Sequence, residues 1–336
     1  MQYMLGKSYY QIAKYKKAKS LLQRVFTADS SNISAGTYLG LILMKLREYR
    51  AADQIHLALL IRDRTNAHIY KQLGISAFHQ GNDSTAIANT GKYFSQFEKW
   101  SQIPDADVLY YTGRNYLKVG EVRAALFAFQ EGAKQFPDNR IFHREVANIL
   151  YGKQRYEEAV EPLTTLIALG DSSAGVYQRL GFCYYYLENM IRAKEAFRTA
   201  FTKDPSNGLT AFYLGITNRE TGNSKEAIAL FEQAEKLSYP AYLGDLYIQT
   251  ATAYQQAELF QQAIRAYTQA IEYTSQGRDI LFHIATIYDD DLKDIQNAVE
   301  YYEKYLNHTG ATTSDNENYA RERLQKLKEK MFFDDE

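Results

Sequence analysis

The chain has 336 residues, of which 46% are hydrophobic and 24% charged, and its formal net charge is −1. A charge so close to zero gives no general attraction to nucleic acid or to a membrane surface. The single cysteine, Cys183, excludes a disulfide framework within the chain, and no apolar run approaches the length of a membrane span.

The two halves of the chain differ in charge. Residues 1–150 hold 20 Lys and Arg against 12 Asp and Glu, a net charge of +8, whereas residues 151–336 hold 19 against 28, a net charge of −9. This asymmetry predicts a molecule that is electrically polar from end to end, which can orient approaching partners. The alternative interpretation is that the difference is a chance variation in the charged residues of solvent-exposed faces and has no function.

One pattern recurs along the chain. In residues 178–197 a small residue follows a leucine, a tyrosine comes three residues later, and an alanine and an aromatic residue follow at fixed spacing (Leu180, Gly181, Tyr184, Ala193 and Phe197). The small residue recurs, mostly in steps of 34, as Gly6, Gly40, Gly74, Gly113, Ala147, Gly181, Gly215, Ala251 and Ala285. The alanine recurs as Ala18, Ala52, Ala86, Ala125, Ala159, Ala193, Ala227, Ala263 and Ala298. A fixed period of this length is typical of a repeat architecture.

These residues, together with the late prolines Pro137 and Pro205, resemble the tetratricopeptide repeat, and the resemblance covers roughly residues 1–310. It implies an all-α fold, a right-handed superhelical α-solenoid of helix–turn–helix repeats. We expect nine repeats, at about 1–30, 33–64, 67–96, 107–137, 140–171, 174–205, 208–239, 244–275 and 278–309. Residues 311–336 would form a C-terminal capping helix, at 316–331, and a short frayed acidic tail.

Each repeat should consist of two antiparallel helices, here called helix A and helix B. The small residue of helix A and the alanine of helix B would allow the two helices to cross at close range, and the following aromatic residue would fill the space against the next repeat. In repeat two His56 takes the place of that aromatic residue, and we interpret it as a packed imidazole and not as a ligand. In repeat three Asp83 is the expected N-cap of helix B.

Departures from the pattern follow in chain order. About five residues are inserted near 97–105, where Trp100 could form a local contact point or could pack on its own repeat. Repeat seven has Asn218 at the tyrosine position. Repeat nine has a longer turn, in which Asp289 and Asp291 resemble ligands of a calcium loop. Because Asp294 stands where that loop needs glycine, helix capping by Asp294 is the favoured interpretation.

The sequence contains no pattern typical of catalysis. There is no His-Glu-x-x-His or Gly-x-Ser-x-Gly motif, and the six histidines are dispersed without the spacing of metal ligands. We therefore predict no catalytic residue, no metal site and no cofactor, and we expect the protein not to be an enzyme.

The resemblance implies that the A helices line a concave groove. The residues expected to face it are rich in tyrosine and arginine, which are enriched in protein-binding hot spots, and arginine pairs well with carboxylates. The candidate peptide-binding residues are Tyr110, Tyr111, Arg114, Arg144, Asn148, Tyr151, Gln178, Arg179, Phe182, Tyr185, Tyr186, Tyr213 and Arg219. The alternative is that about half of them pack between neighbouring A helices.

The function expected from this pattern is a non-enzymatic scaffold or adaptor that binds an extended or helical peptide segment, acidic and aromatic in character, as part of a larger assembly. One alternative is a regulatory or sensory module that binds a short peptide or a small ligand. RNA binding by a basic aromatic groove is a further alternative, but the acidic C-terminal half opposes it and no nucleic-acid partner is expected. Association with a membrane-bound assembly stays open. So does the compartment, which is cytoplasmic, or periplasmic if an upstream signal segment was removed.

Overall fold

The computed structural model describes residues 1–96, 105–237, 243–275, 277–308 and 314–334. Throughout these ranges the regular secondary structure is helical, without a strand. The prediction of an all-α solenoid of paired helices is confirmed for them. Residues 97–104 of the predicted insertion around Trp100 lie outside the described residues.

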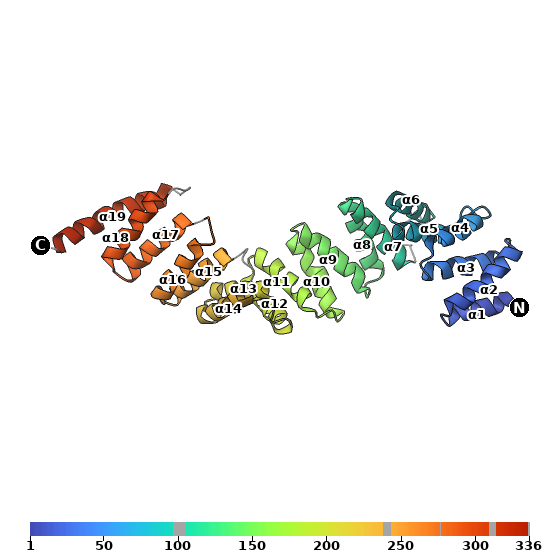
Figure 1. Cartoon of the computed structure of the whole chain (residues 1–336), viewed down its shortest axis with the longest axis horizontal. Helices are drawn as coiled ribbons and strands as arrows, with labels where there is room; N and C mark the ends of the chain where they lie inside the picture. The colour runs from blue at the N-terminus through green and yellow to red at the C-terminus, as the bar shows by residue number, and fades with distance from the viewer. Residues whose placement is uncertain (97–104, 238–242, 276, 309–313, 335–336) are drawn as a thin grey trace. The chain divides into compact units, whose positions relative to one another are not determined.

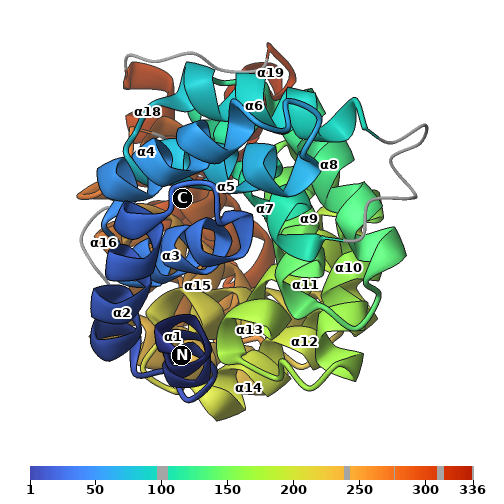
Figure 2. The same cartoon turned by 90° about the vertical axis from the view of Figure 1, so that its right-hand side faces the viewer.

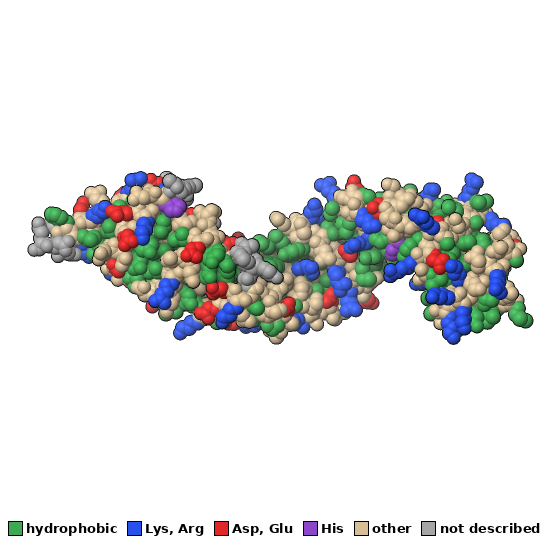
Figure 3. Space-filling view, in the orientation of Figure 1, with side chains coloured by type: hydrophobic (Ala, Val, Ile, Leu, Met, Phe, Trp, Pro, Cys, Tyr) green, Lys and Arg blue, Asp and Glu red, His purple; other side chains and the backbone are tan. Residues whose placement is uncertain are grey.

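The chain divides into two compact units, Met1–Gln154 (the N-terminal unit) and Arg155–Glu336 (the C-terminal unit). By sequence, the N-terminal unit carries 21 Lys and Arg against 12 Asp and Glu, a net charge of +9, and the C-terminal unit 18 against 28, a net charge of −10. Figure 3 shows Lys and Arg side chains, in blue, spread over the N-terminal unit on the right of the view.

The N-terminal unit consists of helices that pack on their neighbours in chain order, as four A–B pairs followed by the A helix of repeat five (Figure 1). Its helices are α1 (Gln2–Gln11), α2 (Tyr15–Ala28), α3 (Ile33–Lys45), α4 (Tyr49–Leu60), α5 (Ala67–His79), α6 (Asp83–Phe94), α7 (Ala106–Lys118), α8 (Val122–Gln135) and α9 (Arg140–Gly152).

The C-terminal unit continues the same pairing, and α11 to α14 lie side by side in Figure 1 and Figure 2. Its first helices are α10 (Tyr156–Ala168), α11 (Ala174–Tyr186), α12 (Met190–Lys203), α13 (Gly208–Glu220), α14 (Ser224–Leu237), α15 (Leu243–Gln256) and α16 (Phe260–Ile271). They are followed by α17 (Gly277–Thr286), the π-helical turn η3 (Ile287–Asp291), α18 (Ile295–Asn307) and α19 (Ser314–Asp334). α19 starts two residues before the predicted capping helix and extends through part of the tail that was expected to fray.

Within a repeat, the small residue of helix A faces the large residue of helix B. A Cβ atom added to Gly113 would lie 2.5 Å from the Phe129 ring, and one added to Gly215 would lie 2.5 Å from the Phe231 ring. The aromatic residue therefore fills the space above its own glycine as well as reaching the next repeat, where Phe197 lies 5.8 Å from the Tyr213 ring. This double role was not part of the sequence prediction.

Turns and caps repeat as regularly as the helices. The turn after each helix A contains one residue with a positive φ: Ala13, Arg47, Gly81, Gly120, Gln154, Glu188, Gly222, Glu258 or Lys293. Asparagine side chains cap many helices, because their amide oxygen accepts a free backbone N–H of the first turn. In repeat three this cap is Asn82, which accepts from Thr85 N, so the prediction of Asp83 as the cap was wrong. Asp294 caps α18 by accepting from Asn297 N at 3.1 Å, as predicted.

The capping helix α19 is attached to repeat nine by a buried carboxylate. Asp289, in η3, is 4% exposed and accepts two hydrogen bonds from Arg323 of α19, from Nε at 2.6 Å and from Nη2 at 2.8 Å. Tyr302 of α18 donates to the same carboxylate at 3.4 Å. Asp289, considered above as a calcium ligand, is therefore paired with a guanidinium.

The cysteine of the chain belongs to the core. Cys183 lies on α11 and is fully buried, and burial raises the pKa of its thiol to about 12. It therefore acts as a small apolar side chain in the packing of repeat six.

His56 gives the N-terminal unit a predicted sensitivity to acid. The side chain is 2% exposed against Gly40, which confirms a packed imidazole, and burial lowers its pKa from 6.5 to about 4. Between these two values the unfolded chain binds a proton at His56 that the folded chain does not bind. The stability that the folded protein gains from its neutral His56 is therefore complete above pH 6.5 and is lost as the pH falls towards 4. Lowering the pH from about 7.5 to about 5 should cost about 2 kcal/mol at this site.

Replacement of His56 by phenylalanine, the residue at the same position in repeats four, six and seven, should remove that part of the pH dependence. The check is urea unfolding of both proteins at the two pH values. An equal loss of stability in the wild type and in His56→Phe would contradict the assignment to His56.

Candidate interaction surfaces

The candidate residues of the N-terminal unit lie on α7 and α9. Arg144 and Asn148 are exposed, whereas Tyr110, Tyr111, Arg114 and Tyr151 are partly buried. An ion pair connects the two helices, because Arg114 Nη1 lies 3.3 Å from Glu145 Oε1. Arg114 therefore already has a carboxylate partner within the unit.

Tyr111 belongs to an aromatic cluster that sequence reasoning missed. Its ring lies 5.0 Å from Phe78 and 5.3 Å from His79, and His79 stacks on Tyr49 at 4.8 Å. Lys118 lies 3.9 Å above the Phe78 ring, where a cation is attracted to the face of the ring. Phe78 and His79 end α5, but Tyr111 lies in the middle of α7 and Tyr49 begins α4, so no fixed spacing in the sequence marks this cluster.

The candidate aromatic residues of the C-terminal unit come together in a continuous row. Tyr213 of α13 lies 4.7 Å from Phe182 and 5.2 Å from Tyr185, and Tyr185 lies 5.4 Å from Tyr186. Tyr156 of α10, which was not predicted, extends the row by stacking on Tyr186 at 4.5 Å with an interplanar angle of 13°. We call Tyr156, Tyr186, Tyr185, Tyr213 and Phe182 the aromatic row.

Exposure differs along the aromatic row. Phe182 is 7% exposed and also contacts Phe197, so it packs in the core, whereas Tyr186 is 48% exposed. Tyr185 and Tyr213 are half-buried. Burial, followed by the nearby Tyr186 and Glu220, raises the pKa of Tyr185, so its hydroxyl remains a hydrogen-bond donor at neutral pH. The accessible part of the row is thus the tyrosines, with Tyr186 the most open.

The polar candidates of the C-terminal unit make contacts between neighbouring repeats. Gln178 donates to Thr210 Oγ1 at 2.8 Å. The Arg219 side chain is 11% exposed, pairs with Glu220 and donates to Gln249 of α15. Arg179 is partly buried on α11. Gln178 and Arg219 therefore fit the alternative that some candidates pack between repeats.

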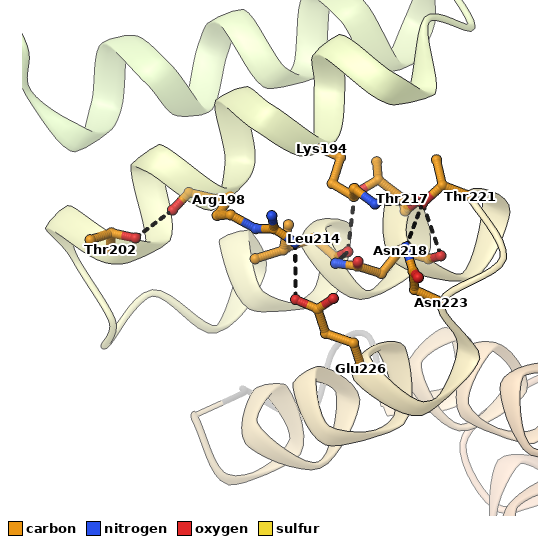
Figure 4. Close-up of polar contacts among 9 residues, drawn as sticks. All are labelled: Lys194, Arg198, Thr202, Leu214, Thr217, Asn218, Thr221, Asn223 and Glu226. Atoms are coloured by element: carbon orange, nitrogen blue, oxygen red, sulfur yellow. Dashed lines mark hydrogen bonds and ion pairs between the residues drawn. The ribbon is translucent and has the colours of Figure 1, made fainter.

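Polar contacts surround Asn218, the residue at the tyrosine position of repeat seven (Figure 4). Asn218 is fully buried and donates to the Leu214 carbonyl at 3.0 Å, while Lys194 of α12 donates to Thr221 Oγ1 at 2.9 Å. At the surface Arg198 pairs with Glu226 at 3.1 Å. These contacts connect α12, α13 and α14. The side chains drawn in Figure 4 therefore hold neighbouring helices together.

Nothing in the described ranges provides a metal centre, since no three His, Cys, Asp or Glu side chains there are placed to hold an ion. Within the same ranges, no helix is both long enough and apolar enough to cross a bilayer.

Comparison with known families agrees with the repeat geometry. One model of the tetratricopeptide repeat matches residues 110–174, 184–240 and 248–316, and a second matches residues 1–28. The chain belongs to the tetratricopeptide repeat family. Members of this family are non-catalytic modules that bind protein or peptide partners.

Solved tetratricopeptide repeat structures share the fold. The C-terminal part of a repeat-containing protein from Cytophaga hutchinsonii has a TM-score of 0.53 and 16% identity, covering 72% of this chain and 98% of that one. YrrB, described as a tetratricopeptide repeat protein with an unusual peptide-binding site, has a TM-score of 0.50 and 18% identity, covering 58% of this chain and 96% of that one.

A curated relative matches a smaller part. The general transcriptional corepressor ssn6 of Schizosaccharomyces pombe is 25% identical over 115 residues, which are 34% of this chain. The matched region spans 10% of the corepressor's length.

Proposed function

We propose that this tetratricopeptide repeat protein is a non-enzymatic scaffold or adaptor that holds an extended or helical peptide segment of another protein within a larger assembly. On the C-terminal unit the segment binds along the A helices of repeats six and seven, α11 and α13. The observation that carries the proposal is the aromatic row, which presents half-exposed tyrosine rings on the C-terminal unit.

Partly exposed tyrosines suit peptide binding for physical reasons. Each ring offers a large apolar area with little conformational entropy to lose, and each hydroxyl can exchange a hydrogen bond with a peptide group. Because the rings of the aromatic row support one another, they are held in position before the partner arrives, which lowers the entropic cost of binding. The peptide-binding site described for YrrB, which shares the fold, is consistent with this proposal.

The charges around the aromatic row suggest how a segment is oriented. Exposed Glu188 follows Tyr186 by two residues, and exposed Glu220 lies near Tyr185. Arg179 lies seven residues before Tyr186 on the same helix, which is two turns or about 10 Å away. Acidic groups of the partner would therefore lie towards Arg179 and its aromatic groups on Tyr185 and Tyr186. On the N-terminal unit the exposed Arg144 would have the same role as Arg179.

The test places a photo-cross-linking phenylalanine analogue at position 186 in the full chain. The matched control is position 273, because Tyr273 lies in the same unit and is 50% exposed against 48% for Tyr186. We expect adducts with partner proteins from position 186 and not from position 273, and Tyr185→Ala should reduce them by about tenfold or more. Equal adducts from the two positions would exclude the aromatic row as the binding surface.

A further inference from the structure

Repeat three lacks the tyrosine that most repeats carry on helix A. The residue three positions after the small residue is tyrosine in five repeats (Tyr9, Tyr116, Tyr184, Tyr254 and Tyr288). Leucine takes the position in repeats two and five, as Leu43 and Leu150, and both of these side chains are buried. In repeat three the residue is Ala77, whose side chain ends at Cβ.

A pocket of about 350 Å³ opens beside Ala77, between α4, α5 and α6 of the N-terminal unit. These three helices lie side by side in Figure 1 and Figure 2. The apolar part of the lining includes Leu57, Tyr70 and Leu73. The volume is in the range of small-ligand sites, which combine an apolar wall with a few polar groups.

The polar groups of the pocket include one carboxylate and one ammonium group. Asp53 of α4 accepts a single hydrogen bond, from Gln80 Nε2 to Oδ2 at 2.7 Å, and Oδ1 is shielded from solvent with no donor among the described residues. Lys92 of α6 lies 5.4 Å from the centre of the Tyr70 ring. Because the two charges balance, the pocket favours a neutral ligand that can donate a hydrogen bond to the carboxylate.

Repeat eight shows where the phenol ring lies when the tyrosine is present at the position of Ala77. There the tyrosine is present, and Tyr254 extends from α15 to the preceding B helix, α14, where its hydroxyl donates to Glu232 at 3.2 Å. Glu232 is on helix B of repeat seven, and the equivalent residue on helix B of repeat two is Leu57. The nearest carboxylate of repeat two is that of Asp53, one helical turn before Leu57. In repeat six the corresponding pocket has a similar volume, about 340 Å³, but Tyr184 is part of its lining, and the pocket is lined by α11 and α12 only. What distinguishes repeat three is therefore that its pocket reaches the preceding B helix, α4.

We propose that the pocket beside Ala77 binds the side chain of a tyrosine in a segment of a partner protein. The phenol ring lies against Leu57, Leu73 and Ala77, and its hydroxyl donates to the Asp53 carboxylate through Oδ2, next to Gln80. The partner thus supplies the tyrosine that repeat three lacks. This site is on the N-terminal unit and does not depend on the aromatic row of the C-terminal unit.

The test uses p-cresol, the side-chain analogue of tyrosine, with the full chain. A ligand of this size should bind with a Kd of about 1 mM, and saturation-transfer NMR detects such binding. Ala77→Tyr restores the residue of five other repeats and should reduce p-cresol binding at least fivefold. Ala88→Tyr is the control, since Ala88 is exposed on α6 and does not line the pocket.

Two further comparisons examine the hydroxyl group and the source of the phenol. Toluene should bind more weakly than p-cresol to the wild type, and Asp53→Asn should bring the two ligands to within twofold of each other. An acetylated Gly-Tyr-Gly amide should compete with p-cresol, whereas the Gly-Phe-Gly peptide should compete more weakly.

Several outcomes would overturn the proposal. Absence of p-cresol binding to the wild type, or equal binding to Ala77→Tyr and the wild type, would show that the pocket is not the site. Equal binding of toluene and p-cresol would remove the role of Asp53. If p-cresol bound but the tyrosine peptide did not compete with it, the ligand of the pocket would be a free phenolic molecule and not a segment of a protein.

Discussion

Replacement of Arg323 by alanine is expected to detach α19 from repeat nine. Arg323 is the cationic partner of the Asp289 carboxylate, whose side chain is 3% exposed. Without the guanidinium, the folded state would contain a buried charge with only the weak Tyr302 hydrogen bond. Because breaking such a pair strands a charge, we expect a loss of about 3 kcal/mol, at the low end of the usual range since Arg323 is 36% exposed.

Hydrogen exchange of α19, together with urea unfolding, measures this effect. Arg321→Ala is the matched control, because Arg321 lies on the same helix and pairs with Glu317 at 2.7 Å while 62% exposed. A surface pair of that kind contributes about 0–1 kcal/mol. Adding Asp289→Asn to Arg323→Ala should recover part of the stability that Arg323→Ala alone loses. If the two arginine variants exchanged α19 amides at the same rate, the Asp289–Arg323 pair would not be what attaches this helix.

Replacement of Gly181 by leucine should destabilise the C-terminal unit by about 3 kcal/mol or more, because the core around it has no space for a side chain. Even a single Cβ atom at this position would lie 2.7 Å from two ring atoms of Phe197, which is itself fully buried. Helices α11 and α12 would have to separate, and the contact of Phe197 with Tyr213 in the next repeat would change with them.

Gly175→Leu is the control for this substitution. Gly175 lies on the same helix, and a Cβ atom added there would have no neighbour within 4 Å. In an open helical position leucine is favoured over glycine by about 0.5–1 kcal/mol, so this variant should gain stability. In urea unfolding, we therefore expect a lower midpoint for Gly181→Leu and a higher midpoint for Gly175→Leu than for the wild type. A loss of stability in both variants would point to the backbone, and not to the glycine–aromatic contact, as the cause.

The regular features of the fold could be predicted from the sequence because they depend on small residues at fixed spacing. The nine alanines and the nine small residues of helix A mark where the two helices of each repeat approach closely, so the positions of helix pairs follow from the period. The packed imidazole of His56 followed from the same comparison between repeats.

Side-chain partners could not be predicted in the same way. The Asp289–Arg323 pair joins residues 34 positions apart through a π-helical turn that the repeat pattern does not contain. Arg114 and Arg219 were candidates for binding a partner, but their contacts to Glu145 and Gln249 depend on how the next A helix is placed. The stacking of Tyr156 on Tyr186 likewise depends on the turn between two helices.

The burial of Cys183 has a practical consequence for chemical labelling. A thiol reacts with maleimides and iodoacetamides as its thiolate, and a pKa raised to about 12 leaves almost none of that form at neutral pH. The native chain therefore has a very low background in thiol chemistry. A fluorophore or spin label directed to one engineered surface cysteine would mark that position alone, without removal of the native residue from the core.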